Sequence, residues 1–247
     1  MSAPDLALAA LFFIIALAYA SVGHAGASGY IAAMSLVGLA PATIRPVALA
    51  LNVLVASIGV WRFHRAGLID WKRLSPFVLG SMPTAFLAAK YLHSPELIKR
   101  VLAAVLLFAA IQLWRTAAGA ARDDTTARAP NALLAFGAGA AIGLVSGLTG
   151  TGGAIFLTPL LLFAHWARTR EASGLSAGFV LANSLAGLAG LNAAAITFPT
   201  AMPLWFGAVA LGALLGARLG TSTLPVPILK RVLALVLLVA AGKLALT

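Results

Sequence analysis

The chain has 247 residues, of which 62% are hydrophobic and only 9% are charged, and its mean hydropathy is +1.01. About a quarter of the residues of a soluble domain are charged. The composition therefore excludes a soluble domain and indicates an integral membrane protein. We attribute the formal net charge of +11 to basic residues that flank membrane spans and predict no nucleic-acid partner. The absence of cysteine excludes disulfides, thiol catalysis and cysteine metal sites.

Apolar segments fill most of the chain, and a helix that crosses a bilayer needs about 20 such residues. They are predicted near residues 5–22, 23–41, 43–61, 74–92, 97–115, 131–148, 150–166, 172–196, 203–220 and 227–246. No basic leader precedes the first segment, so we interpret it as a retained helix and not as a signal peptide. Segments 23–41 and 150–166 are short and glycine-rich, which leaves full crossings, broken helices and re-entrant hairpins open. The sequence thus predicts an all-α polytopic membrane protein with about 8–10 membrane segments.

The sequence also repeats itself. A polar stretch at 116–130 is interpreted as a cytoplasmic linker between a first repeat, residues 1–115, and a second repeat, residues 131–247. The five letters KRVLA at 99–103 recur at 230–234, and Asn52 matches Asn183. Three glycines of the first repeat align with three of the second at a shift of about 124 residues: Gly23, Gly26 and Gly29 with Gly147, Gly150 and Gly153.

Charge placement predicts how the repeats are related. If each half crosses the membrane an odd number of times, the halves are inverted, and only five of the 17 basic residues lie outside: Arg45, Lys90, Lys99, Arg100 and Lys243. If each half crosses an even number of times, the basic residues divide almost evenly. Because cytoplasmic loops are enriched in Lys and Arg, we predict inverted repeats. A rotation of about 180° would then carry Gly26 onto Gly150 and Asn52 onto Asn183.

The acidic residues exclude several functions. All six lie in loops or at segment edges: Asp5, Asp70, Glu96, Asp123, Asp124 and Glu171. Cation transporters and proton pumps usually need a carboxylate within the membrane, so we predict no cation or metal substrate and no metal site. Paired-carboxylate catalysis is excluded from the membrane core, and a lipid- or quinone-modifying enzyme would need clustered acids, histidines or cysteines there. We therefore predict no enzyme activity, no catalytic residue and no cofactor.

The two glycine motifs are the candidate binding site. A broken helix leaves backbone N–H groups without partners, the next half-helix adds the positive end of its dipole, and glycine allows close backbone approach. An anion would satisfy these groups, as phosphates do at helix N-termini. Glycine-rich breaks can also be close-packing turns, but duplication and polar residues in both copies favour a site. We predict that it contains His24, Gly26, Ser28, Gly29, Asn52, Thr149, Gly150, Thr151, Gly152, Gly153 and Asn183.

Individual roles remain open at this point. His24 could contact the ligand, carry a proton or donate a structural hydrogen bond. Arg45 could attract anions, or its side chain could extend to the lipid headgroups. Asn52 and Asn183 could hold the glycine loops or contact substrate. Other glycines recur every four residues and are interpreted as helix-packing positions: Gly139, Gly143 and Gly147, and Gly212, Gly216 and Gly220.

The second motif, GLTGTGGAIFLTPLL at residues 147–161, resembles the signature of the sulfite exporter TauE/SafE family. Together with the repeat and the length, the resemblance covers nearly the whole chain. It implies a multi-pass permease of the cell inner membrane for small sulfur-containing or organic anions, often an exporter. The first half departs from the family pattern, with Gly26-Ala27-Ser28-Gly29 in place of a glycine triplet and Ser35 where Pro159 would map.

Residues and resemblance together predict a secondary transporter of a small anion such as sulfite or a sulfonate, expected to be an exporter, which works by alternating access around a midplane site. The alternative is an anion channel on the same scaffold. The predicted partners are the small anion and the lipid bilayer, and the sequence is compatible with a homo-oligomer.

Overall fold

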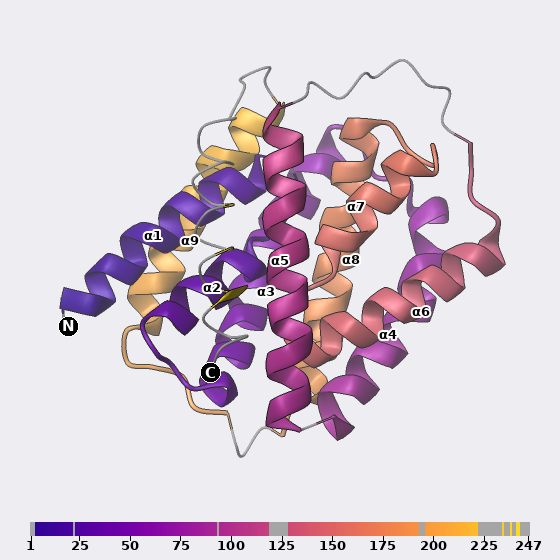
Figure 1. The fold of residues 1–247 in the computed structure, drawn as a ribbon. Coiled ribbons are helices and arrows are strands. Elements are labelled where there is room, and N and C mark those ends of the chain that lie inside the picture. The colour runs from indigo at the N-terminus through magenta and orange to yellow at the C-terminus, as the bar shows by residue number, and fades with distance from the viewer. Residues whose placement is uncertain are drawn as a thin grey trace.

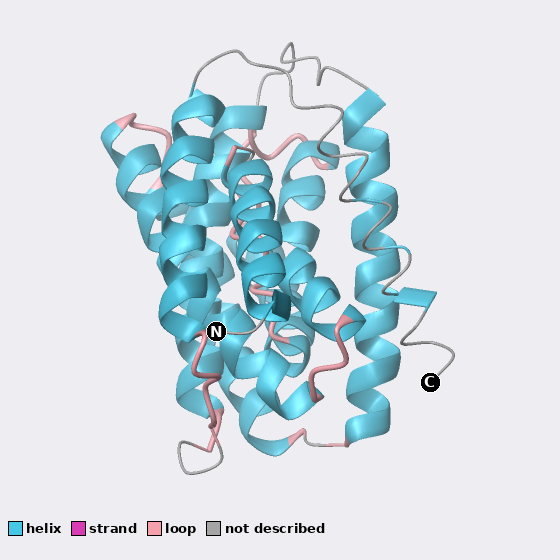
Figure 2. Ribbon diagram, turned by 90° about the vertical axis from the view of Figure 1, so that its left-hand side faces the viewer, coloured by secondary structure: helices cyan, strands magenta, loops and turns pink. Residues whose placement is uncertain are grey.

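The structure is a computed structural model, which describes residues 3–21, 23–92, 94–118, 128–192, 196–221, 234, 238 and 241–242. It is all-helical over these residues (Figure 2). The helices are α1 (Ala3–Ala20), α2 (Ala27–Leu36), α3 (Pro41–Arg65), α4 (Trp71–Tyr91), α5 (Pro95–Ala118), α6 (Ala132–Thr149), α7 (Ala154–Phe163), α8 (Thr169–Gly190) and α9 (Met202–Thr221). Most of the predicted segment 227–246, most of the linker and the repeated letters at 230–233 lie outside the described residues.

The sequence determines where several helices begin. The Asp70 carboxylate accepts hydrogen bonds from the backbone N–H groups of Lys72 and Arg73, at 3.0 and 3.2 Å, and so caps α4. The Asn131 side-chain oxygen accepts a hydrogen bond from the backbone N–H of Leu133, at 2.8 Å, and so caps α6. By contrast, α2 and α7 begin after Gly26 and Gly153 with no side-chain cap. Their first turns therefore keep the positive end of the helix dipole without a capping side chain.

Four described helices, α3, α6, α8 and α9, contain a stretch that is long and apolar enough to cross a membrane. The stretches are Pro41–Arg65, Ala132–Thr149, Arg170–Gly190 and Met202–Leu219. Pro4–Ala20, Ala27–Leu36 and Ala154–Phe163 are apolar but shorter. At about 1.5 Å per residue, the ten-residue helices α2 and α7 are roughly 15 Å long, about half the hydrocarbon thickness of a bilayer. A full helical crossing is therefore excluded for the described parts of segments 23–41 and 150–166, which form broken or re-entrant helices.

The helices are arranged as two outer pairs around a central one. In Figure 1, α1 lies beside α9 on one side and α4 beside α6 on the other, with α3 and α8 between them. Helix α1 of the first half thus packs on the last described helix of the second half, and α4 packs on the first helix of the second half. In chain order, α1, α3 and α4 of the first half correspond to α6, α8 and α9 of the second. Exchanging counterparts turns the pair of α1 and α9 into the pair of α6 and α4 and leaves the central pair unchanged, as expected for two-fold pseudosymmetry.

Glycines bring the outer pairs close together. A Cβ on Gly139, Gly143 or Gly147 would lie 2.1 to 2.3 Å from a backbone oxygen of α4, and one on Gly212 or Gly216 would lie 2.4 or 2.2 Å from a backbone oxygen of α1. Small residues allow such approach in lipid, where packing drives helix association. The predicted packing role of these glycines is confirmed. The packing of Gly220 lies outside what the structure describes.

The same contacts give the directions of the helices. Gly139 and Gly147 meet Phe77 and Ala85, so α4 and α6 run in the same direction. Gly212 and Gly216 meet Phe13 and Leu17, so α1 and α9 also run in the same direction. In the central pair, Gly59 meets Ala177 while Leu49 meets Gly187, so α3 and α8 are antiparallel.

The predicted register of the repeat is wrong. Gly23 and Gly26 have positive φ values of 78° and 94°, and their conformational counterparts are Gly150 and Gly153, at 79° and 85°. Helices α2 and α7 then follow at the same offset and have the same length. Gly26 therefore corresponds to Gly153 and not to Gly150. Counted from the starts of α3 and α8, Asn183 corresponds to Val55, so the predicted match of Asn52 with Asn183 is also wrong. Because glycine recurs every third residue in both motifs, an alignment moved by three residues still superposes two glycine pairs, Gly23 with Gly150 and Gly26 with Gly153.

Candidate functional site

The loop between α6 and α7, residues 150–153, is a break in the helical backbone inside the protein. Gly150 ends α6 in the left-handed conformation, and its N–H donates to the Ser146 carbonyl at 2.7 Å. Gly152 and Gly153 also have positive φ values, 77° and 85°. Residues with a Cβ rarely adopt this conformation. Three glycines thus allow the chain to leave α6 and to start α7 within four residues.

Two amide side chains face this loop from the central helix pair. Asn52 on α3 and Asn183 on α8 are 0% exposed, and neither amide group has a hydrogen-bond partner among the described residues. A Cβ on Gly152 would lie 2.7 Å from Asn52 Nδ2, and one on Gly153 would lie 3.5 Å from Asn183 Nδ2. Buried polar groups are usually paired, so two buried amides without partners at one loop indicate a place for a polar ligand.

Two serine hydroxyls extend this polar cluster. Ser184 Oγ would lie 3.3 Å from a Cβ on Gly152, and Ser146 lies one turn before Gly150 on α6. Both serines are fully buried, and neither Oγ has a partner among the described residues. Ser184 adjoins Asn183 in the sequence, which makes it visible there as a candidate. Ser146 gives no comparable signal, because serine also occurs as a small packing residue in membrane helices.

The predicted threonines bond to each other within the loop. Thr149 Oγ1 donates to the Val145 carbonyl at 2.7 Å, and the two hydroxyl oxygens of Thr149 and Thr151 are 3.0 Å apart. With the Thr149 proton directed to the backbone, Thr151 is the donor between them. In this conformation both hydroxyl protons fix the shape of the loop.

Arg45 lies against the same loop. Arg45 is only 7% exposed. Its guanidinium donates a hydrogen bond to the Gly147 carbonyl, and its Cγ would lie 3.1 Å from a Cβ on Gly150. The side chain therefore extends into the protein and not to the lipid headgroups. Sequence reasoning left both directions open and omitted Arg45 from the site; its position four residues after the start of a long apolar helix was the available signal.

The predicted residues of the first half divide between two surroundings. The Ser28 hydroxyl lies 2.9 Å from Tyr19 Oη, and Gly29 packs against Ile15, so both face α1. Gly26 packs against Tyr30 and Ile15. These three residues do not contact the second glycine loop in any described interaction.

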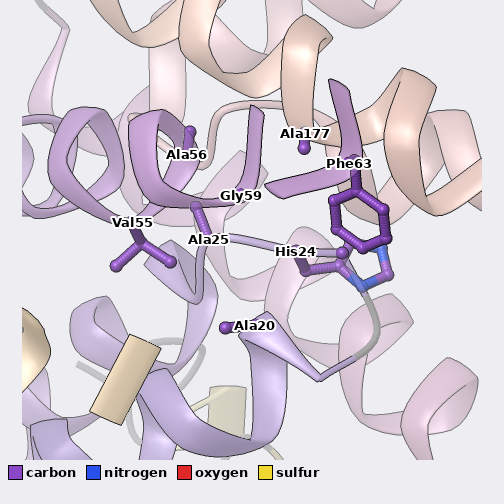
Figure 3. Close-up of a pocket in the computed structure, with 9 residues that line it drawn as sticks. Ala20, His24, Ala25, Val55, Ala56, Gly59, Phe63 and Ala177 are labelled. Carbon is purple, nitrogen blue, oxygen red and sulfur yellow. The ribbon is translucent and has the colours of Figure 1, made fainter. Parts of the chain in front are cut away.

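His24 does reach the second half. Its Nε2 lies 3.0 Å from Thr158 Oγ1 and 3.3 Å from the Ala154 carbonyl, one residue beyond Gly153. Thr158 in turn lies 2.7 Å from Ser176 Oγ on α8. The ring borders a small, mostly apolar pocket that Phe63 also lines (Figure 3). Thr158 and Ser176 were missed from sequence; the available signal was a hydroxyl within the otherwise apolar α7.

The structure thus gathers seven predicted residues around one loop: Asn52, Thr149, Gly150, Thr151, Gly152, Gly153 and Asn183. His24 approaches from the other half. No group of three or more potential metal-ligating side chains occurs among the described residues. Several apolar helices with a buried cluster of amides, hydroxyls and an arginine at a helix break define a polytopic membrane protein with an internal polar site, which is the construction of a membrane transporter.

Comparison with known proteins agrees with this class. The family model described as Sulfite exporter TauE/SafE matches residues 8–244, and the chain belongs to that family. It is 41% identical over 246 residues to a protein of Sinorhizobium fredii (strain NBRC 101917 / NGR234) named "Probable membrane transporter protein y4hK", an alignment that covers 99% of each chain. No solved structure matches. The predictions of family, multi-pass membrane protein and transporter, not enzyme, are confirmed.

Proposed function

We propose that the protein is a secondary carrier that exports a small anion, such as sulfite, a sulfonate or a related organic anion. The observation that carries the proposal is the pair of buried amides at the Gly150–Gly153 loop, neither of which has a partner among the described residues. Amide N–H groups donate to anions, and the uncapped start of α7 adds backbone donors and the positive end of its dipole.

The distribution of acids supports an anion over a cation. The acids in the described residues lie at helix starts or just before them: Asp5 near the start of α1, Asp70 before α4, Glu96 in the first turn of α5 and Glu171 in the first turn of α8. None of them is near the middle of a helix. A cation at the glycine loop would therefore have no carboxylate from the described part of the chain to offset its charge.

The helix directions support alternating access between inverted halves. Helix α3 is antiparallel to its counterpart α8, and each outer pair joins one helix from each half. This arrangement is expected when a rotation about an axis in the membrane plane relates the halves. We propose that the two outer pairs move relative to the central pair and expose the loop to one side of the membrane at a time.

A binding screen of the purified protein tests the proposal. Unfolding temperature is measured with sulfite, thiosulfate, sulfate, sulfonates and small carboxylates, and with metal cations and amines in parallel. An anion present at about 100 times its Kd stabilises the folded state by about 2.7 kcal/mol, so at least one anion should raise the unfolding temperature by several degrees. Stabilisation by a metal cation or an amine, with none by any anion, would contradict the proposal.

A further inference from the structure

The charge on Arg45 has no acidic partner within the described part of the chain. The ion pairs there join Arg73 to Asp70 and Glu171, and Arg100 to Glu96, all at the surface. Arg45 instead donates to a neutral carbonyl, that of Gly147. A buried, unpaired charge is costly in a protein interior. The energetic cost falls when an anion binds beside the guanidinium.

The guanidinium also retains donor capacity. Nε of Arg45 is buried and has no partner in the described residues, and neither has the hydroxyl of Ser146, the residue that precedes Gly147. Guanidinium N–H groups form a planar fork that fits two oxygens of one oxyanion. Arg45 therefore places a charged hydrogen-bond donor at the same loop that the amides of Asn52 and Asn183 face.

The corresponding position at the first-half loop, Ser173 on α8, lacks this charge. Arg45 is the fifth residue of α3 and contacts Gly150, and Ser173 is the fifth residue of α8 and contacts Gly23, the counterpart of Gly150. Asn183 and Ser184 likewise have Val55 and Ala56 as counterparts, counted from the same helix starts. Val55 and Ala56 line the pocket of Figure 3. The two loops share left-handed glycines at Gly23 and Gly150 and at Gly26 and Gly153, but Gly152 is also left-handed while its counterpart Ala25 is not, and the side chains around the loops differ.

We propose that Arg45 binds the substrate anion directly, so that the transporter has one anion site, at the second-half loop, and selects singly charged oxyanions. This inference rests on the proposed function and adds the charged residue and the charge of the substrate. One guanidinium neutralises one negative charge. A doubly charged anion of the same shape keeps an uncompensated charge in a poorly solvated site, so methanesulfonate should bind at least tenfold more tightly than sulfate.

Arg45→Gln tests the assignment, with Arg62→Gln as the matched control. Arg62 lies near the other end of α3, with its guanidinium carbon 5.7 Å from the centre of a Trp61 ring. Binding of methanesulfonate to purified protein is measured by calorimetry. We expect affinity to fall about 10- to 100-fold in Arg45→Gln, as for the loss of a hydrogen bond to a charged group, and to change less than threefold in Arg62→Gln.

A second measurement separates binding from a structural role. If Arg45 only tied α3 to Gly147, Arg45→Gln would lower the unfolding temperature without anion. If it binds anion, the variant should keep that temperature and lose the increase that methanesulfonate gives the wild type. Should Arg45→Gln not fold, Arg45→Lys keeps the charge without the fork, and we expect at least tenfold weaker binding.

The outcomes distinguish the two proposals. No binding of any anion to the wild-type protein would overturn the proposed function itself. Anion binding that is equal in wild type and Arg45→Gln, or in Arg45→Lys where that variant is used, would overturn only the role of Arg45. Tighter binding of sulfate than of methanesulfonate would overturn the selection of singly charged anions.

Discussion

Replacement of Gly152 by alanine is expected to abolish anion transport in a protein that still folds. The new Cβ would lie 2.7 Å from Asn52 Nδ2 and 2.8 Å from Val180 Cγ1, and the backbone φ of 77° disfavours any side chain. The loop would have to move, and the Asn52 amide with it. The backbone conformation alone costs roughly 1–2 kcal/mol, which a folded membrane protein can tolerate. Transport in proteoliposomes and the unfolding temperature are measured together.

Two other glycines separate the causes. Gly38 has a φ of 82°, but no atom lies within 4 Å of the position that a Cβ would take, so Gly38→Ala introduces backbone strain without a clash. Gly137 on α6 also has open space and no positive φ, so Gly137→Ala introduces neither. Both controls should transport. If Gly152→Ala transports as well as Gly38→Ala, the loop is a packing turn and not a binding site.

Asn52→Leu and Asn183→Leu should separate substrate binding from fold stability. Each change replaces a buried amide without a described partner by an apolar group of similar size, which is nearly neutral or stabilising for the fold. Each amide that donates to a bound anion contributes about 1.5–3 kcal/mol, so affinity should fall roughly tenfold or more. Unfolding temperature without ligand and anion affinity are measured on the same samples.

Ser57→Ala is the control for these variants, because Ser57 is exposed on α3 and its hydroxyl bonds only to the backbone of Val53 among the described contacts. It should leave both quantities unchanged. The opposite pattern in the asparagine variants, with lower stability and unchanged anion affinity, would assign Asn52 and Asn183 to holding the loops together.

Much of the fold follows from local physical chemistry and could be predicted from the sequence. Runs of apolar residues give the long helices, and acidic or amide caps such as Asp70 and Asn131 set where they start. The glycine clusters correctly indicate that the chain breaks before α2 and α7. Glycines at every fourth position, such as Gly139 and Gly143, correctly indicate close helix packing.

The site was harder to predict because it depends on contacts between distant segments. Arg45 and Gly147 are 102 residues apart, and His24 and Thr158 are 134 residues apart. The position of Arg45 one turn into an apolar helix was a local signal, but it did not give the direction of the side chain. The three-residue spacing of the glycines also hid the correct register of the repeat, so the counterpart relation between Arg45 and Ser173 became visible only once both helices were placed.

We expect this transporter to carry a small anion in a saturable conformational cycle. Counterflow in proteoliposomes tests it most directly. Vesicles are loaded with a high concentration of unlabelled sulfite or methanesulfonate and diluted into a trace of the same labelled anion. We predict a transient accumulation of label above its equilibrium level, saturable with concentration and absent in Gly152→Ala. Anion flux without counterflow would indicate a channel, and no anion flux in either direction would contradict the claim.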